Sequence, residues 1–589
     1  MHPSEIYSQL LAQREASHAR WQRWHTRIGW ARLLLAAVFI LIAWAGMVRG
    51  LSPRWLLVPA AAFAALVLYH QWVRTQQSLA QRAVTFYRAG LERLAGGYAP
   101  PGASGDRFLD VHHLYAADLD LFGKQGLYEQ LCTARTPMGE DTVARWLLAP
   151  AELDAIRDRH ACVAELRGRV ELREALALTG EPPRLALHTD TLTQWAAAPS
   201  ELAHPALRIA AALLAIAAAA AAAAWAIFGV SFPFLAVLLA EAALTYALRN
   251  RVQAAVAGVE NAYEDLKLLA ALLRRVESEH FDAPPLRALK KRLSSHELTA
   301  SSTLAKLATI VNFVEARRNP LLVPLMLPLM YVVHSAIAAE RWRHRHGHVI
   351  ASWLGVLGEI EALQSLAAYS FERPEDPFPQ FLEGSATFRA SGLGHPLISA
   401  KTRVRNDLDL TGTARVLLVS GSNMSGKSTL LRSVGVNTVL AMAGAPVCAH
   451  RLALTPLQIG ASIRVNDSLH EGSSRFYAEI SRLRQLVEPW RLPLLFLLDE
   501  LLQGTNSTDR RIGAQGVVRA LLDRGGIGLV STHDLALADE VLLNRGSLRN
   551  VHFQDELRDG RLTFDFKLRD GVVTKSNGIE LMRAIGLDV

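Results

Sequence analysis

Cysteine is scarce in this 589-residue sequence, which contains only Cys132, Cys162 and Cys448. The three lie far apart and match no metal-ligand spacing, and an odd number cannot form a complete disulfide framework. The cysteine content therefore argues against a disulfide-stapled scaffold and indicates a reducing compartment.

Charge is also low. Charged residues make up 20% of the chain, whereas about 25% is typical of soluble domains, and the mean hydropathy is positive at +0.15. A soluble fold must cover its core with polar residues, so this average indicates that lipid surrounds part of the chain. Lys and Arg number 63 against 55 Asp and Glu, a net charge of +8. The length suggests roughly three to four domains.

A first pair of uncharged runs covers residues 33–48 and 55–73, with a Gly-Leu-Ser-Pro turn at residues 50–53. Runs of about 16 to 19 residues, at 1.5 Å per residue, cross most of a roughly 30 Å hydrocarbon core. The pair therefore predicts an uncleaved membrane hairpin rather than a signal peptide. Arginines flank its outer ends and predict that both ends face the cytoplasm, at an inner or plasma membrane: Arg14, Arg20, Arg23, Arg27, Arg74 and Arg82.

A second pair covers residues 209–228 and 234–248, and Glu241 interrupts its last run. We expect a second membrane hairpin here, although buried helices of a soluble bundle are the alternative for the Ala-rich block. A fifth apolar run, residues 321–339, contains Pro324 and Pro328. We expect this run to be a buried core helix, with a fifth membrane span as the alternative.

A phosphate-binding loop lies in the C-terminal third. Residues 415–420 predict a strand, which leads into the spacing G-x-x-x-x-G-K-S and then a helix from Thr429. The glycines let the backbone fold around phosphate, Lys427 supplies charge to the β/γ-phosphates, and the Ser428 hydroxyl ligates Mg²⁺. We expect ATP to contact Gly421, Ser422, Asn423, Met424, Ser425, Gly426, Lys427, Ser428 and Thr429.

Two further apolar runs end in polar residues. Residues 494–498 lead into Asp499 and Glu500, and residues 527–530 lead towards His533. Asp499 is the expected Mg²⁺ ligand and Glu500 the expected general base. His533 is expected near the γ-phosphate, because ligands bind at the carboxyl ends of such strands. The three strands predict an α/β sheet that binds and hydrolyses ATP.

These motifs resemble those of the MutS mismatch-repair ATPase family. Residues 421–428 resemble the family's loop G-P-N-M-G-G-K-S, residues 499–509 its D-E-x-G-x-G-T-x-x-x-D segment, and residues 531–533 its [AS]-T-H switch. The resemblance implies a homodimer formed through the ATPase domain, in which Ser474 reaches the partner's γ-phosphate. It also implies DNA as a partner.

Similarity to the family extends upstream, to about residue 109. Residues 118–123 and 136–139 resemble the helical core of the family, and residues 361–367 resemble the lever that joins this core to the ATPase.

The departures from the family concern the parts that read DNA. The first hairpin takes the place of a mismatch-reading domain, and the second lies about where a DNA-gripping clamp would be inserted. Residues 381–383 match the family's Phe-x-Glu wedge only by chance, and Gln503 and Arg510 replace residues that are usually Arg and Gly. We also expect no C-terminal helix-turn-helix extension.

The predicted fold is multidomain, with membrane helical hairpins, an all-α core and lever, and a C-terminal α/β P-loop ATPase domain. The expected segments are the N-terminal membrane hairpin (1–80), the first part of the core (81–205), the second hairpin (206–250), the second part of the core with the lever (251–384), and the ATPase domain (385–589).

The leading hypothesis for function is a membrane-anchored MutS-related ATPase that acts on mismatched or branched DNA as a dimer. Basic residues 341–345 could contact either DNA phosphates or anionic lipid. One alternative is a membrane-tethered ATPase that acts on protein partners. Another is a transporter resembling the ABC group, although the chain has no LSGGQ-like sequence before residue 499.

Overall fold

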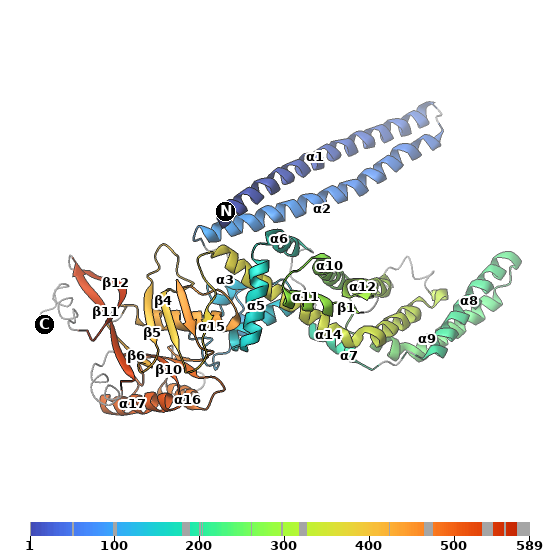
Figure 1. Cartoon of the computed structure of the whole chain (residues 1–589). Coiled ribbons are helices and arrows are strands. Elements are labelled where there is room, and N and C mark those ends of the chain that lie inside the picture. Colours follow the sequence, from blue (N-terminus) through green and yellow to red (C-terminus); the bar gives the residue numbers. More distant parts are fainter. Residues whose placement is uncertain are drawn as a thin grey trace.

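The computed structural model describes residues 2–49, 52–97, 103–179, 189–199, 202, 204–260, 262–295, 298–316, 327–422, 424–463, 475–532, 546–558 and 561–573. The molecule is elongated: an α/β domain lies at one end and a helical body follows (Figure 1). One helical hairpin projects from the middle of the molecule, and a second extends from the end opposite the α/β domain. A mostly helical N-terminal part and a C-terminal part with two mixed sheets agree with the predicted multidomain organisation.

Hairpin 1 consists of α1 (Pro3–Arg49), the short η1 (Pro53–Leu56) and α2 (Leu57–Leu94). Both long helices continue well beyond the uncharged runs, because the flanking sequence is rich in Gln, Arg, Ala and Leu, which favour helix. The most apolar 18-residue stretch of α1 has 0% of its residues buried, and that of α2 has 17%. The apolar half of this hairpin is therefore uncovered by protein.

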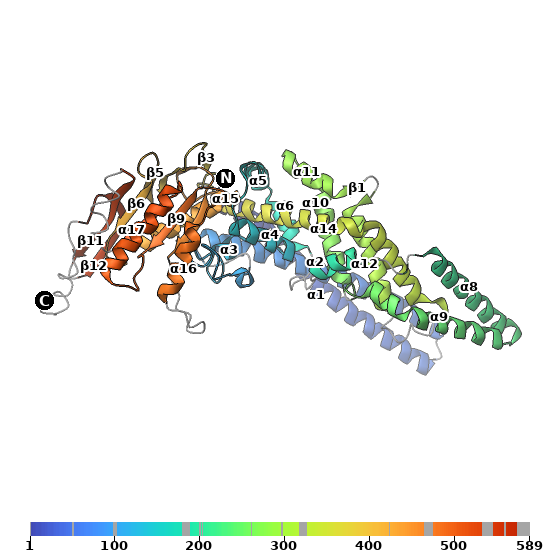
Figure 2. The same cartoon turned by 90° about the horizontal axis from the view of Figure 1, so that it is seen from below.

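Hairpin 2 consists of α8 (Pro205–Phe228) and α9 (Phe232–Val256). Gly229 ends α8 with φ of 74°, and Pro233 lies in the first turn of α9. The most apolar stretches of these helices are 17% and 11% buried. In both views the two hairpins project from the body in a similar direction (Figures 1 and 2).

The longest helix of the body is α14 (Tyr331–Glu372). It is one of five helices within the described ranges that are long and apolar enough to cross a membrane. The protein buries 72% of its most apolar stretch, in contrast to the hairpin helices. The core helix was expected over residues 321–339; in the described part of that run it begins only at Tyr331, and Leu327–Leu329 form the short η3 instead, because Pro328 has no backbone N–H to donate. Residues 317–326, which include Pro324, lie outside the described part of the chain.

Other helices pack around α14 to form the body. The predicted all-α core needs one correction, because β1 (Ser294–Ser295) and β2 (Leu298–Thr299) form a short antiparallel pair within it. The remaining elements are η2 (Asp106–Phe108), α3 (Leu127–Leu131), α4 (Pro137–Leu148), α5 (Leu153–Leu166), α6 (Val170–Leu178), α7 (Thr189–Ala197), α10 (Tyr263–Ser278), α11 (Pro284–Arg292), α12 (Ala300–Ala316) and η3 (Leu327–Leu329).

A six-stranded sheet, in the order β12-β11-β6-β10-β9-β8, forms the centre of the α/β domain. All neighbours are parallel except β11 and β12. Its strands are β6 (Val416–Ser420), β8 (Gln458–Ser462), β9 (Leu494–Asp499), β10 (Ile527–Thr532), β11 (Leu548–Arg558) and β12 (Arg561–Asp570).

Helices cover both faces of this sheet. Leu417 and Val419 of β6 face a core shared with α15 (Lys427–Ala443) and the helical body. Val416 and Leu418 face a second core under α16 (Arg475–Val487) and α17 (Ser507–Asp523). Apolar side chains on both faces are expected of a parallel sheet buried between helices.

A second sheet of four strands, in the order β3-β7-β4-β5, joins α14 to the larger sheet. Its strands are β3 (Gln380–Phe381), β4 (Phe388–Leu393), β5 (Asn406–Leu410) and β7 (Arg451–Leu454). The wedge-like residues 381–383 begin in β3, and Phe381 packs against the core. That the match to the family's wedge arose by chance stays a prediction.

Candidate nucleotide-binding site

The predicted site lies where β6, β9 and β10 end at one edge of the sheet. The register pairs Ser420 of β6 with Thr532 of β10, and Ser531 of β10 with Asp499 of β9. Because the strands are parallel, the polar residues that follow each strand meet at this edge. The phosphate-binding loop starts here, directly after β6.

The loop wraps closely on itself. Gly421 has φ of 151°, and a Cβ there would lie 2.7 Å from Ser425 Oγ. Gly426, with φ of 107°, precedes the first residue of α15. Both positions favour glycine. Met424 is 86% exposed, and Asn423 lies outside the described residues.

Lys427 is buried at the centre of the loop. Its Nζ donates hydrogen bonds to the carbonyl oxygens of Gly421 at 2.8 Å and Ser422 at 3.0 Å. Burial lowers the pKa of Lys427, and the nearby carboxylates of Glu500 and Asp499 oppose that shift. The ammonium group is thus held over the loop by its carbonyls.

Two hydroxyls of the loop stand out because they are buried. Ser422 Oγ and Ser425 Oγ are buried, and neither makes a hydrogen bond within the part of the chain that the structure describes. Buried polar groups are normally satisfied. Two hydroxyl donors beside an ammonium group and a helix N-terminus fit phosphate oxygens as the missing acceptors.

The predicted metal ligands already touch each other. Ser428 Oγ donates to Asp499 Oδ2 at 2.5 Å. No group of three or more His, Cys, Asp or Glu side chains within the described ranges is placed to hold a metal ion. One hydroxyl and one carboxylate nevertheless suit Mg²⁺, which usually keeps several waters and takes few protein ligands beside substrate phosphates.

Ser531 is a site residue that sequence reasoning did not select. Its Oγ donates to the Asp499 carboxylate and accepts from the Glu500 amide at 3.1 Å. Glu500 has φ of 50°, and its carboxylate accepts from the Gln503 side-chain amide. Ser531 thus fixes the Asp499 carboxylate and the backbone of Glu500, and its place in the Ser-Thr-His motif was the available signal.

A cleft of about 210 Å³ adjoins the loop. Phe553 of β11 and Phe566 of β12 line it, with Gly426 and Thr429 at the start of α15. His395 also lines it, and burial lowers the pKa of this side chain to about 4, which leaves it neutral at neutral pH. The cleft therefore offers aromatic and uncharged surface directly beside the phosphate loop.

Residues 417–588 match the family model for MutS domain V. The C-terminal domain of this chain belongs to the MutS family. The Endonuclease MutS2 of Thermus thermophilus is 33% identical over 235 residues, which cover 40% of this chain and 30% of that protein.

Two relatives named DNA mismatch repair protein MutS give similar matches. The Geobacillus sp. strain WCH70 protein is 32% identical over 232 residues (38% of this chain, 26% of that protein). The Brevibacillus brevis protein is 31% identical over 265 residues (44% of this chain, 30% of that protein). The chain thus matches less than a third of the length of these MutS relatives.

The segment after β9 of this MutS domain is held from two sides. The Arg510 guanidinium donates to the carbonyl oxygens of Leu502, Gln503 and Thr505, each at 3.3 Å. The Leu502 amide donates to Glu479 of α16 at 2.6 Å. Arg510, noted in the sequence only as a departure from the family, therefore has a structural role here.

Two predicted site residues besides Asn423 lie beyond what the structure describes. Ser474 and His533 both lie outside the described residues. Ser474 immediately precedes α16, and His533 immediately follows Thr532 at the end of β10. Their expected contacts with the γ-phosphate remain predictions.

Proposed function

We propose that this protein binds ATP with Mg²⁺ and hydrolyses it, as a membrane-anchored dimer that acts on DNA. The observation that carries the ATPase proposal is the meeting of Lys427, Ser428, Asp499 and Glu500 at one edge of a sheet that matches MutS domain V. The unsatisfied loop hydroxyls support the same assignment.

Each residue has a distinct task in this proposal. Lys427 exchanges its bonds to the loop carbonyls for bonds to the β/γ-phosphates. Ser428 and Asp499 hold Mg²⁺, which neutralises charge on the phosphates when it is bound. Glu500, whose backbone amide is bonded to Ser531, positions the attacking water and accepts its proton. The aromatic cleft beside the loop accommodates the base.

The ATPase proposal is tested by titrating a fluorescent ATP analogue into the full-length protein in detergent. Lys427→Ala should abolish binding, whereas Lys401→Ala, an exposed lysine of the same domain, should bind as the wild type does. If Lys427→Ala bound the ATP analogue as tightly as the wild type does, this assignment of the nucleotide site would be refuted.

The dimer proposal extends the site across two copies. By the family resemblance, Ser474 of one protomer completes the site of the other, and His533 senses the γ-phosphate. Ser474→Ala should lower hydrolysis, and mixing it with Lys427→Ala protomers should restore part of the activity. A fully active strict monomer would contradict the arrangement.

The membrane proposal rests on exposed aromatic residues spaced along hairpin 1. Trp24 and Trp44 of α1 are 41% and 58% exposed, and 20 helical residues span about 30 Å. Trp55 and Trp72 of α2 are 62% and 48% exposed. Tryptophans at two levels about one hydrocarbon thickness apart are typical of the two interfaces of a bilayer.

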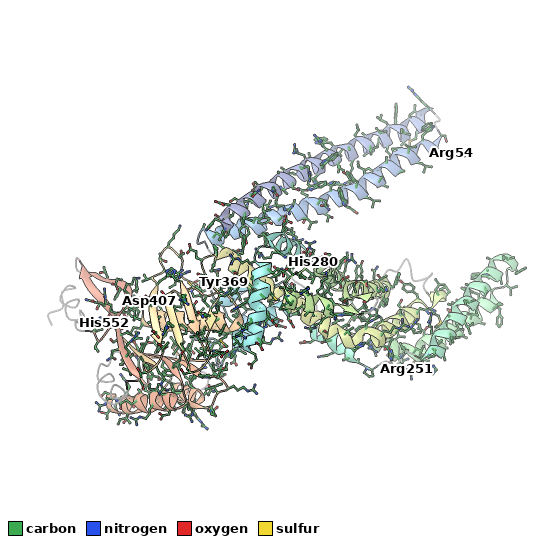
Figure 3. The ribbon with its side chains drawn as sticks, viewed as in Figure 1. Arg54, Arg251, His280, Tyr369, Asp407 and His552 are labelled. Carbon is green, nitrogen blue, oxygen red and sulfur yellow. The ribbon has the colours of Figure 1, made fainter. Side chains whose placement is uncertain are left out.

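Accessibility to a membrane-impermeant thiol reagent tests this topology. Arg54 lies at the far tip of hairpin 1 (Figure 3), so Arg54→Cys should react from the side of the membrane opposite the ATPase domain. Gln22→Cys, below the apolar half, should react only after the membrane is opened. Release of the protein by alkaline carbonate would contradict the anchor.

The DNA proposal derives from the names of the MutS relatives and from the basic character of the chain. A mobility-shift panel with homoduplex, mismatched and branched DNA, at several salt concentrations, tests it. Salt-sensitive binding is expected because phosphate contacts release counterions. If no DNA binds, the membrane-tethered ATPase that acts on protein partners replaces it.

A further inference from the structure

Hairpin 2 carries one charged residue between the arginines at its base. Arg208 lies near the start of α8 and Arg249 lies in α9. From residue 209 to residue 248 the sequence contains no Asp, Glu, Lys, Arg or His other than Glu241. At 1.5 Å per residue, Glu241 lies about 12 Å along α9 from Arg249 and about 14 Å from the first residue of α9. Glu241 is therefore close to the middle of a stretch that matches a roughly 30 Å hydrocarbon core.

The outer surface of hairpin 2 is apolar and uncovered by protein. Ile216, Ile227, Phe228 and Leu239 are all more than half exposed. Protein surfaces rarely present large apolar patches to water, whereas lipid accommodates them. The outer surface therefore supports a position of this hairpin in the bilayer.

Glu241 lies in the seam between the two helices, and not on this outer surface. It is 2% exposed. Leu248 and Val252 are also buried and follow it at helical spacing, so the three residues share one face of α9. Counted from the turn at residue 230, Glu241 lies at the level of residue 219 of α8, beside the buried Ala218 and Ala221. A carboxyl group thus occupies a position of the seam at which the neighbouring residues are apolar.

The Glu241 carboxyl group has no hydrogen-bond partner within the part of the chain that the structure describes, although both of its oxygens are buried. Buried polar groups are normally satisfied. The alanine side chains across the seam offer no donor, and amides in the interior of a helix donate to the carbonyl oxygen four residues earlier. The surroundings of Glu241 therefore leave its oxygens to a ligand that brings its own bond.

The other described elements that contact hairpin 2 are η3 and α14. Residues 327–329 of η3 include no titratable side chain, and the first turn of α14 brings Tyr331 and His334. Val333, which lies between these two, packs in one cluster with Leu248 of α9. Leu248 is about two turns nearer the base than Glu241. The titratable groups of α14 therefore lie at the level of the base.

The chemistry of the seam selects the ligand. An isolated carboxylate in apolar surroundings is very costly, in protein and in lipid alike. A metal cation takes several oxygen or nitrogen ligands, and within the described ranges no group of three or more His, Cys, Asp or Glu side chains is placed to hold one. A proton needs one carboxylate oxygen and removes the charge. The proton is therefore the ligand that this site fits.

We propose that Glu241 is a proton-binding site within the membrane, and that α8 and α9 stay packed only while the proton is bound. The inference rests on the proposed membrane anchoring, extended to hairpin 2, and does not depend on ATP hydrolysis. Loss of the proton leaves a carboxylate against Ala218 and Ala221, and the two helices must separate or rotate to hydrate it. Hairpin 2 is thus a proton-sensitive element of the membrane part.

The contrasting arrangement is an ionised Glu241 that pairs with a cation of another molecule. Such a pair would place the carboxylate on the outer surface of the hairpin, whereas Glu241 lies in the seam. The two arrangements differ in the protonation state of Glu241 at neutral pH, which carbodiimides report.

Dicyclohexylcarbodiimide, which partitions into lipid, tests this state on the full chain in phosphatidylethanolamine–phosphatidylglycerol nanodiscs. A protonated carboxyl group gives its proton to a carbodiimide nitrogen while its oxygen bonds to the central carbon, and the adduct rearranges to a stable N-acylurea without loss of an atom. Peptide mass spectrometry quantifies the adduct at Glu241. Glu264 of α10, with its side chain 76% exposed, is the matched control. A water-soluble carbodiimide is applied in parallel.

At neutral pH the lipid-soluble reagent should modify Glu241 at least about tenfold faster than Glu264, because a glutamate in water is almost entirely ionised. The rate at Glu241 should fall as the pH is made alkaline. The water-soluble reagent should show the opposite preference. Glu241→Gln, which has the same shape and no charge, should remove the adduct.

Hydrogen exchange, corrected for intrinsic rates, tests the packing of the hairpin. A peptide covering residues 234–248 should lose protection at alkaline pH in wild type and keep it in Glu241→Gln. Residues 57–66 of α2 contain no titratable side chain, so their protection should not change and serves as the control in the same sample. If Glu241→Gln fails to fold, the pH profile of the wild-type adduct still tests the bound proton.

Three outcomes overturn the inference. Absence of an adduct at Glu241 at neutral pH refutes the bound proton. The same pH dependence of protection in wild type and Glu241→Gln refutes the link to packing. Faster modification of Glu241 by the water-soluble reagent shows that hairpin 2 lies outside the bilayer, and leaves the nucleotide site and the anchor formed by hairpin 1 standing.

Discussion

Glu361 of α14 is a buried carboxyl at the start of α4, and it predicts a specific pH dependence of local stability. Its carboxylate accepts hydrogen bonds from the Thr136 hydroxyl, the Thr136 amide at 3.3 Å and the Arg135 amide at 3.2 Å. Burial raises its pKa from 4.5 to about 7, and the bonds from Thr136 and Arg135 oppose the shift. Burial therefore changes the pKa of Glu361 more than the three hydrogen-bond donors do.

The raised pKa of Glu361 determines whether local stability rises or falls with pH. Between pH 4.5 and about 7 the folded protein keeps a proton that the unfolded chain releases. The free energy of opening this region therefore falls as the pH rises through that window, by about 3 kcal/mol in total at roughly 1.4 kcal/mol per pKa unit. The stabilisation is fully present below pH 4.5 and lost above pH 7.

Comparison of wild type with Glu361→Gln isolates this contribution. His160 and His395, whose pKa values burial lowers to about 4, act in the opposite direction, so the wild-type curve alone is not diagnostic. Hydrogen exchange of a peptide covering residues 136–148, corrected for intrinsic rates, reports the local opening. Wild type should lose protection relative to the variant from pH 4.5 to 8. A constant difference, or one of opposite sign, would refute the reasoning.

Three further predictions concern the loop, the acidic pair and the hairpin base. Gly421→Ala should weaken ATP binding through backbone strain of about 1–3 kcal/mol. Gly516→Ala is the control, because its helical position has no atom within 4 Å of a new Cβ, and it should leave ATP binding unchanged in the same titration. Ser531→Ala should lower kcat with little change in ATP affinity, because Ser531 fixes the Asp499 carboxylate and the backbone of Glu500 without being placed to hold phosphate; a steady-state assay in which KM alone changes would contradict this. Arg93→Ala should cost about 3–5 kcal/mol of local stability at the hairpin base, because it leaves the buried Glu372 carboxylate without its ion-pair partner. Limited proteolysis should cut there faster than in wild type, with no comparable change for the exposed Arg88→Ala.

The strands of the nucleotide site could be predicted because each is marked by a local sequence pattern, an apolar run followed by polar residues. Three apolar runs end in a phosphate loop, an acidic pair and a Ser-Thr-His motif, and parallel strands bring such ends together. The loop itself was recognisable from spacing alone. Ser531 was passed over because its role depends on the register between β9 and β10, which pairs it with Asp499.

The hairpins were predictable in their apolar runs but not in their full length or attachment. Helix α1 continues to Pro3 because polar helix formers extend it below the uncharged run. Its attachment to the body depends on Arg93 and Glu372, which are 279 residues apart in sequence. No local sequence pattern predicts the Arg93–Glu372 ion pair, because arginine and glutamate side chains in helices usually face solvent. The same holds for Glu361 and Thr136.

Hydrolysis by the Glu500→Gln variant tests the central claim most directly. Single-turnover ATP hydrolysis should be measured on full-length wild type and variant, with binding of the same ATP recorded in parallel. The site predicts that the variant binds ATP with Mg²⁺ and hydrolyses it at least about 100-fold more slowly, since a positioned general base contributes roughly 10²–10⁴-fold. Hydrolysis at the wild-type rate in Glu500→Gln would contradict the assignment of the catalytic site.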